Sequence, residues 1–232
     1  MIFQATKNYQ IGILTTIVFI VLVPLISPIF VDFFSGFGVL TIGILHGAND
    51  LEIISKSFKG KLNNLYLKSI LLYISVVLFG GVLFFTLPSI SLIVFVLFSC
   101  YHFGEQHWED RLSFSLFHLA FFTIYGAFIF FLMFTLQYDS VVEVIEKISG
   151  YRLDFEFFQF TAVLLGIILL INILLKVSIR SHIIKEALLL LLLACIFYVG
   201  SLWFAFAFYF VVWHSLPSLS DQLKFLFGEM NL

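Results

Sequence analysis

Four histidines lie in short polar segments at the ends of long apolar stretches: His46 in HGAND, His102 and His107 in YHFGEQHWED, and His214 in VVWHSLPSL. Imidazole is costly inside a bilayer, and neutral imidazole is also the commonest side-chain ligand of metal ions. Because these residues recur at equivalent positions, the pattern predicts that His46, His102 and His214 converge on one metal ion. Iron, copper and zinc are ions that imidazole suits well.

Two carboxylates follow these histidines at helical spacing. Asp50 comes four residues after His46, and Glu105 comes three residues after His102. On a continuous helix each carboxylate shares a face with its histidine, so we expect both to orient the imidazole rings. The competing interpretation of the first pair is a solvated helix end, with His46 hydrogen-bonded to a backbone carbonyl.

The other histidines have less specific positions. His107 follows His102 by five residues, which is about 500° of rotation on an α-helix, so the two bind one ion only if the backbone unwinds near Gly104. His118 lies about one turn into the next apolar stretch, whereas His182 is expected to be solvated. For His214 the competing interpretation is an interfacial histidine near the last carbonyls of a helix.

The composition places these residues in an integral membrane protein. Of the 232 residues, 62% are hydrophobic and 11% are charged, and the mean hydropathy is +1.12. No single core could hide that much apolar surface in water. The net charge of −2, without a long basic run, gives no surface for nucleic acid. Cys100 and Cys195 both fall in apolar stretches and indicate no disulfide or zinc site.

The apolar stretches predict an all-α, polytopic helical bundle that forms one transmembrane domain over residues 1–232. A span needs about 20 apolar residues. Pro28, Pro88 and the charged loops separate stretches of this length. The predicted spans are 11–27, 29–47, 65–87, 89–107, 113–137, 156–178, 184–199 and 201–217.

The last two spans are the ambiguous ones. The stretch 187–216 is long for one helix and short for two, and Gly200 and Ser201 lie in its middle. With eight spans, His46, His102 and His214 all emerge on the same side of the membrane, with the last span ending at Pro217. With seven spans, His214 faces the opposite side. We therefore expect about eight spans, with one long tilted helix as the alternative.

The basic residues predict the orientation. Of the 12 Lys and Arg residues, only Lys147 and Arg152 fall on the side opposite the termini in the eight-span arrangement. By the positive-inside rule both termini are then cytoplasmic, and the protein lies in the inner membrane of the cell. The segment 138–154 has apolar residues at helical spacing and is expected to lie in the interface.

Three motifs carry a resemblance to a known family. HGANDLEI at 46–53, YHFGEQHW at 101–108 and WHSLPSLSDQ at 213–222 resemble the Brp/Blh family of bacterial membrane β-carotene 15,15′-dioxygenases. The resemblance implies a non-haem iron(II) enzyme that splits the central double bond of β-carotene with O₂ to give two molecules of all-trans-retinal. It also implies a functional link to a microbial rhodopsin.

The resemblance makes His46, His102 and His214 the iron ligands and catalytic residues, with Asp50 as the acidic residue of the first motif. One position departs from the family, because Ser218 stands where members carry a further histidine, four residues after the one that matches His214. His107 is the first substitute for that ligand, His118 the second, and a water-occupied position the third alternative.

Two other functions remain open from the sequence. The HFGEQH segment has the spacing of one histidine box of the di-iron desaturases and hydroxylases, but those enzymes generally need about eight histidines and this chain has 6. A non-enzymatic carrier of retinal or carotenoid is the second alternative. A carrier predicts paired charges inside several spans, for which Asp32 is the candidate that the sequence offers.

Overall fold

The protein is all-helical over the residues that the structure describes. The computed structural model describes residues 2–57, 65–109, 111–112 and 115–228, and of these the side chains of 2–8, 50–52, 54–57, 65–66, 116 and 177–178 lie outside the description. No strand occurs within these ranges. The prediction of an all-α fold is therefore confirmed.

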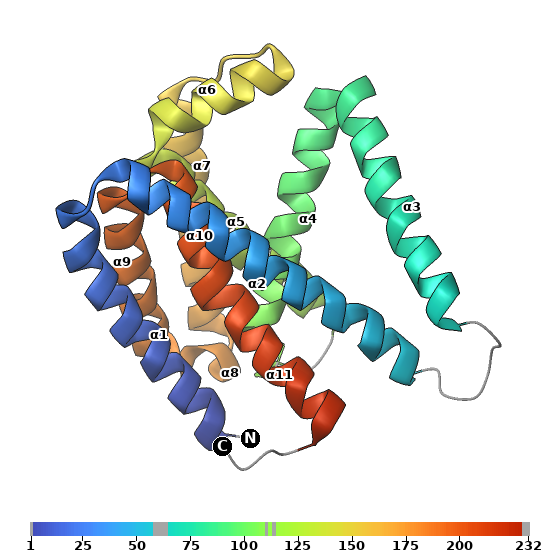
Figure 1. The fold of residues 1–232 in the computed structure, drawn as a ribbon. Coiled ribbons are helices and arrows are strands. Elements are labelled where there is room, and N and C mark those ends of the chain that lie inside the picture. Colours follow the sequence, from blue (N-terminus) through green and yellow to red (C-terminus); the bar gives the residue numbers. More distant parts are fainter. Residues whose placement is uncertain (1, 58–64, 110, 113–114, 229–232) are drawn as a thin grey trace.

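Eleven α-helices, one 3₁₀ turn and one π-helical segment follow one another along the described chain (Figure 1). They are α1 (Ile2–Leu22), the 3₁₀ turn η1 (Val23–Leu25), α2 (Pro28–Ser57), α3 (Leu65–Thr86), α4 (Pro88–Trp108), α5 (Leu116–Leu136), α6 (Tyr138–Ser149), α7 (Phe155–Leu175), α8 (Val177–Arg180), α9 (Ile183–Val199), α10 (Leu202–Phe208), the π-helical segment η2 (Tyr209–Ser215) and α11 (Leu216–Phe227).

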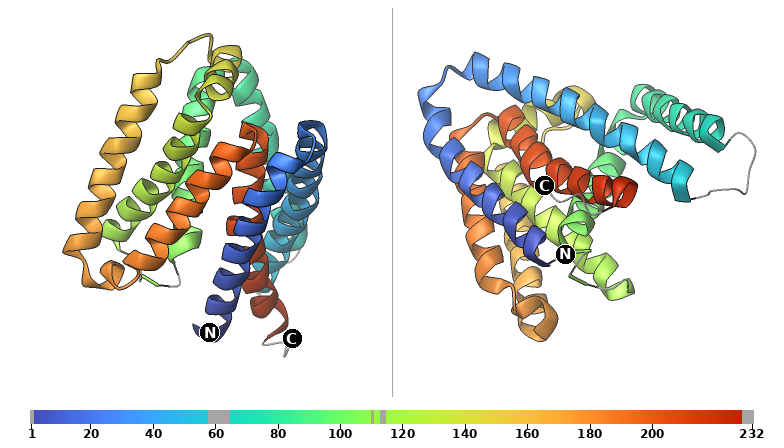
Figure 2. Two further views of the ribbon diagram at one scale, coloured as in Figure 1. Left: turned by 90° about the vertical axis from the view of Figure 1, so that its left-hand side faces the viewer. Right: turned by 60° about the horizontal axis from the view of Figure 1, so that its bottom comes forward.

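The predicted spans correspond to α1, α2, α3, α4, α5, α7, α9 and the continuous stretch from α10 to α11. Six helices of the described chain are long and apolar enough to cross a membrane, while the apolar segment Tyr9–Leu25, which runs from α1 into η1, and the 17-residue α9 are shorter. The prediction of a polytopic membrane protein is therefore confirmed. The start of α1 and the end of α11 lie at the same end of the bundle (Figures 1 and 2), as an even number of crossings requires.

The predicted boundary at Gly200 and Ser201 is present. Helix α9 ends at Val199, and α10 begins at Leu202. Ser201 caps α10, because its Oγ accepts a hydrogen bond of 3.1 Å from the backbone N–H of Phe204. The stretch is thus two short helices rather than one long one.

The predicted end of the last span at Pro217 is wrong. The helix continues to Phe227, and the π-helical segment precedes Pro217, with Leu216 N–H donating to the carbonyl of Val211, five residues back. A π-turn shifts the hydrogen-bond ladder, so Pro217 occupies the first turn of a new α-helix, where its missing N–H is tolerated. His214 consequently lies inside a span rather than at its end.

Helices α4 and α5 approach each other closely at two glycines. A Cβ atom built on Gly104 would lie 1.9 Å from the carbonyl oxygen of Phe122, and one built on Gly126 would lie 1.9 Å from that of Cys100. Helix α4 stays regular through Gly104 as far as Trp108. This glycine therefore brings two backbones together and does not unwind the helix.

Helix α3 lies at the edge of the bundle (Figures 1 and 2). Within the described chain its main neighbours are α2 and α4. Residues 71–79 are exposed at every position, which covers all faces of the helix over more than two turns. The buried core lies instead among α5, α9 and η2, where Tyr125, Leu193 and Tyr209 are almost fully enclosed.

Candidate metal centre

Three of the predicted histidines come together from three separate elements. His46 lies on α2, His102 on α4 and His214 on η2. One ring nitrogen from each forms a group whose members all lie within 4.8 Å of one another. The ring centroids of His102 and His214 are 4.7 Å apart, and those of His46 and His214 are 5.6 Å apart.

The spacing fits a single metal ion. Two nitrogens bound to one ion at about 2.1 Å each are at most about 4.2 Å apart. The observed limit of 4.8 Å is only slightly larger, so small rotations of the rings bring all three within bonding distance. Three imidazoles also leave coordination positions open for a small molecule, as in catalytic metal sites.

The central residue of the group, His214, fits a metal ligand. Its side chain is only 2% exposed, and within the described part of the chain its Nδ1 atom has no hydrogen-bond partner. A buried polar atom left unpaired costs about 1 to 3 kcal/mol. A metal ion bound at Nδ1 would satisfy this atom. The donor set of three neutral imidazoles suits iron, copper or zinc.

Aromatic rings surround His214. The centroid of the buried Phe103 ring lies 4.2 Å from that of His214, and the Phe210 ring lies at 5.8 Å. The ring of Phe98 stacks on His102, with the centroids 6.2 Å apart. Phe98 is 68% exposed, so the group is enclosed at His214 and approaches the lipid-facing surface at His102.

Of the two predicted carboxylates, Glu105 has a described side chain and Asp50 does not. Helix α2 continues through residue 50, so Asp50 follows His46 on a regular helix as expected, but the Asp50 side chain lies outside the described residues. Glu105 accepts a hydrogen bond from the hydroxyl of Tyr101. That either carboxylate orients a histidine stays a prediction.

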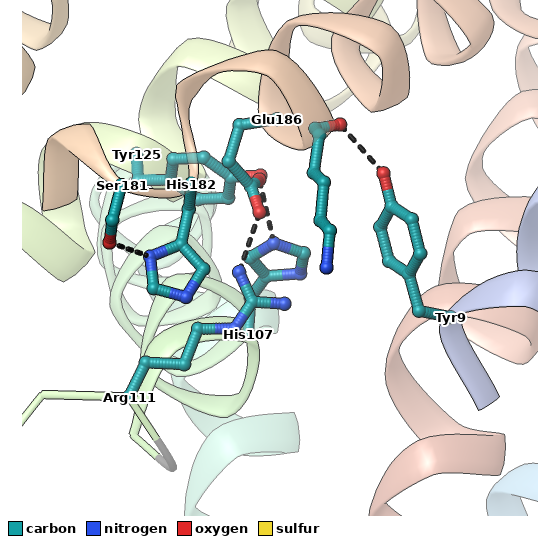
Figure 3. A network of polar contacts seen from close by, with 8 residues as sticks. Tyr9, His107, Arg111, Tyr125, Ser181, His182 and Glu186 are labelled. Atoms are coloured by element: carbon teal, nitrogen blue, oxygen red, sulfur yellow. Dashed lines mark hydrogen bonds and ion pairs between the residues drawn. The ribbon is translucent and has the colours of Figure 1, made fainter. Parts of the chain in front are cut away.

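His107 lies in a second polar cluster (Figure 3). Its Nε2 atom is 2.9 Å from Oε2 of Glu186, whose other oxygen accepts a hydrogen bond of 2.6 Å from Arg111. Tyr125 donates to the same carboxylate at 2.7 Å. Because α4 stays helical, His102 and His107 diverge, and the structure does not bring His107 into the group of three.

The other two histidines also lie outside the group. His118 is in the first turn of α5, where its backbone N–H donates to Ser115 Oγ and its ring stacks on Phe122. His182 lies 3.0 Å from Ser181 Oγ and contacts the ring of Trp108.

Two residues of these clusters were not found by sequence reasoning. Glu186 is 2% exposed, although it stands in the first turn of α9 where a carboxylate usually meets solvent. The sequence feature that could have indicated Glu186 is its position as an acidic residue at the start of an apolar helix, where a carboxylate needs a basic partner. The second is Gln222, whose Nε2 atom lies 3.1 Å from Nδ1 of His46.

Comparison with known proteins gives one finding. The family model described as beta-carotene 15,15'-dioxygenase matches residues 37–231, a range that contains His46, His102 and His214. Comparison with curated proteins and with solved structures finds no match.

Proposed function

The chain belongs to the beta-carotene 15,15'-dioxygenase family, and on that premise we propose that it cleaves the central 15,15′ double bond of β-carotene with O₂ to give two molecules of all-trans-retinal. The metal in this proposal is one iron(II) ion held by His46, His102 and His214. The observation that supports it is the convergence of three imidazoles from three helices within 4.8 Å.

Three neutral imidazoles suit this chemistry. They leave the iron its full positive charge and keep positions open for O₂, whose activation is the chemistry that the ion supplies when bound. We propose that solvent or O₂, rather than His107, takes the positions that the three histidines leave, since His107 is engaged with Glu186. Ser218 stands where family members carry a further histidine, which is consistent with a site of three protein ligands.

The surroundings of the site suit a hydrocarbon substrate. β-Carotene offers no polar group, so apolar contact must position its polyene chain. Phe98 presents an exposed ring beside His102, and aromatic faces pack well against a conjugated chain. We therefore propose that the substrate arrives from the bilayer along this side of α4.

The buried part of the site around His214 excludes water. His214 and its neighbour Phe103 are almost fully buried, and Tyr209 stacks on Phe103 at 5.4 Å. Exclusion of water protects a reactive oxygen species from side reactions and strengthens polar interactions within the site. The protein thus supplies a buried surface that excludes water at η2 and an apolar contact surface at α4.

The membrane arrangement follows from the same elements. We propose that both termini are cytoplasmic in the inner membrane, so that the three histidines lie toward the cytoplasmic leaflet. The proposed product is a retinal, which is the chromophore of microbial rhodopsins. A functional link to such a rhodopsin is therefore part of the proposal.

The alternative of a di-iron oxidase receives less support. Such a site needs a second set of ligands beside the first. Among the described residues, His46, His102 and His214 form the one group of three or more His, Cys, Asp or Glu side chains with metal-binding spacing. One ion per chain is the stoichiometry that this geometry supports.

Expression in a bacterium that accumulates β-carotene tests the proposal, with chromatography of the extracted carotenoids. The wild-type chain is expected to produce retinal, and His46→Ala, His102→Ala and His214→Ala variants that insert normally are expected to produce none. His182→Ala is the matched control, because His182 lies outside the group and contacts Trp108. Unchanged β-carotene with the wild-type chain would refute the proposal.

A further inference from the structure

The side-chain amide of Gln222 approaches one of the three histidines. Its Nε2 atom lies 3.1 Å from Nδ1 of His46, and Gln222 is only 7% exposed. We propose that Gln222 is a positioning residue of the metal site, which fixes the ring of His46 and selects the nitrogen that faces the ion. This inference rests on the function proposed above.

Helix α11 presents Gln222 to α2. Ser218, Gln222 and Leu226 follow one another at steps of four residues, and all three are buried, so they form the inward face of the helix. His214 precedes Ser218 by four residues. The continuation of the helix past Pro217 thus places His214 and Gln222 on elements that both pack against α2.

The contact leaves one nitrogen of His46 for a metal ion. A histidine ligand uses one ring nitrogen, and the N–H of the other is usually held by a hydrogen-bond acceptor that fixes the tautomer and the ring orientation. Since Nδ1 of His46 faces Gln222, Nε2 is the nitrogen available to the ion.

The amide can serve as this acceptor. The oxygen and nitrogen of a glutamine amide have nearly the same shape, and their orientation is assigned from the hydrogen-bond partners. When Nδ1 carries the proton, the amide presents Oε1 to it in place of Nε2. A neutral amide holds the ring without adding negative charge, so the iron(II) keeps its full charge. Sequence spacing predicts that Asp50 orients His46, and the contact in the structure adds Gln222 as a second orienting residue.

Anaerobic titration of the purified, detergent-solubilised chain with Co(II) tests this role. Co(II) gives visible absorption bands that report its geometry, so affinity and coordination are read in one experiment. Gln222→Met keeps the length of the side chain and removes the acceptor, and it is expected to weaken Co(II) binding about 10- to 100-fold. Gln222→Glu keeps an acceptor and is expected to restore most of the affinity.

Gln137→Met is the matched control. Gln137 is also a partly buried glutamine, but it stands between α5 and α6, and its Nε2 donates to the carbonyls of Phe197 and Gly200 rather than to a histidine of the group. This variant is expected to bind Co(II) as the wild type does.

The outcomes separate this proposal from the proposed function. If the wild type binds no Co(II), both fail. If the wild type binds Co(II) and Gln222→Met binds it equally tightly with unchanged absorption bands, the positioning role alone is refuted. Equal losses in Gln222→Met and Gln137→Met would also refute it. If Gln222→Met does not fold, weak binding by folded Gln222→Glu would refute the role, and near-normal binding would support it.

Discussion

The close approach of α4 and α5 leads to a specific prediction for Gly104→Ala. The added Cβ would lie 1.9 Å from the carbonyl oxygen of Phe122, whereas ordinary contacts begin at 3.4 Å, so the two backbones must separate by roughly 1.5 Å. Neither contacting atom can rotate away, because the Cβ is fixed to the backbone of α4 and the carbonyl oxygen belongs to the backbone of α5. Overpacking of this kind costs about 1 to 3 kcal/mol, which exceeds the gain of up to about 1 kcal/mol from the better helix propensity of alanine.

The same displacement affects the metal site. His102 lies two residues before Gly104 on α4, so its ring moves with the helix relative to His214. Metal–ligand distances tolerate only about 0.2 Å of change. We therefore expect Gly104→Ala to lower both the midpoint of thermal unfolding in detergent and the affinity for Co(II).

Gly80→Ala and Gly81→Ala are the matched controls. Both glycines lie on α3, and within the described chain no atom outside the helix comes within 4 Å of a Cβ built on either. These variants are expected to be as stable as the wild type or slightly more so. A Gly104→Ala chain with wild-type unfolding midpoint and Co(II) affinity would refute the inference that this glycine sets the helix spacing and, through it, the position of His102.

Three further predictions follow from the surroundings of the site. Glu186→Ala removes a buried carboxylate and is expected to destabilise the protein by about 3 to 5 kcal/mol in detergent unfolding. Glu143→Ala, which breaks an exposed ion pair, is expected to have little effect. Equal unfolding midpoints for the two variants would contradict the prediction. Phe98→Ala removes an aromatic contact worth about 0.5 to 1.5 kcal/mol, so it is expected to raise KM for β-carotene about 2- to 10-fold with little change in kcat. Phe160 is about equally exposed but lies on α7, and Phe160→Ala is expected to leave KM unchanged. His107→Ala is expected to lower stability through the lost Glu186 contact but to keep wild-type affinity for Co(II), and loss of Co(II) binding in this variant would show that His107 is a ligand after all.

The membrane spans were predictable because the bilayer constrains them strongly. A helix must cover the apolar core with about 20 apolar residues, and Pro28 and Pro88 mark the starts of α2 and α4. The separation of α9 from α10 followed from Gly200 and Ser201. The continuation beyond Pro217 was not predictable, because a proline usually ends a helix and the pattern of residues 209–215 does not mark a π-helical segment.

The site was predictable in part. His46, His102 and His214 could be grouped because each stands in a polar segment at the end of an apolar stretch, and the structure brings them together. Gln222 and Glu186 could not be found in this way. Gln222 lies 176 residues from His46, and Glu186 lies 79 residues from His107. Polar residues near span ends also look like solvated helix ends until tertiary packing buries them.

The stoichiometry of iron tests the central claim most directly. Anaerobic titration of the purified chain with Fe(II), followed by removal of free metal and elemental analysis, counts the ions that each folded chain retains. We predict one Fe(II) per chain for the wild type and essentially none for His46→Ala, His102→Ala or His214→Ala, each of which removes one member of the group. Two Fe(II) per chain in the wild type, or one Fe(II) retained with wild-type affinity in any of the three variants, would contradict a single ion held by these histidines.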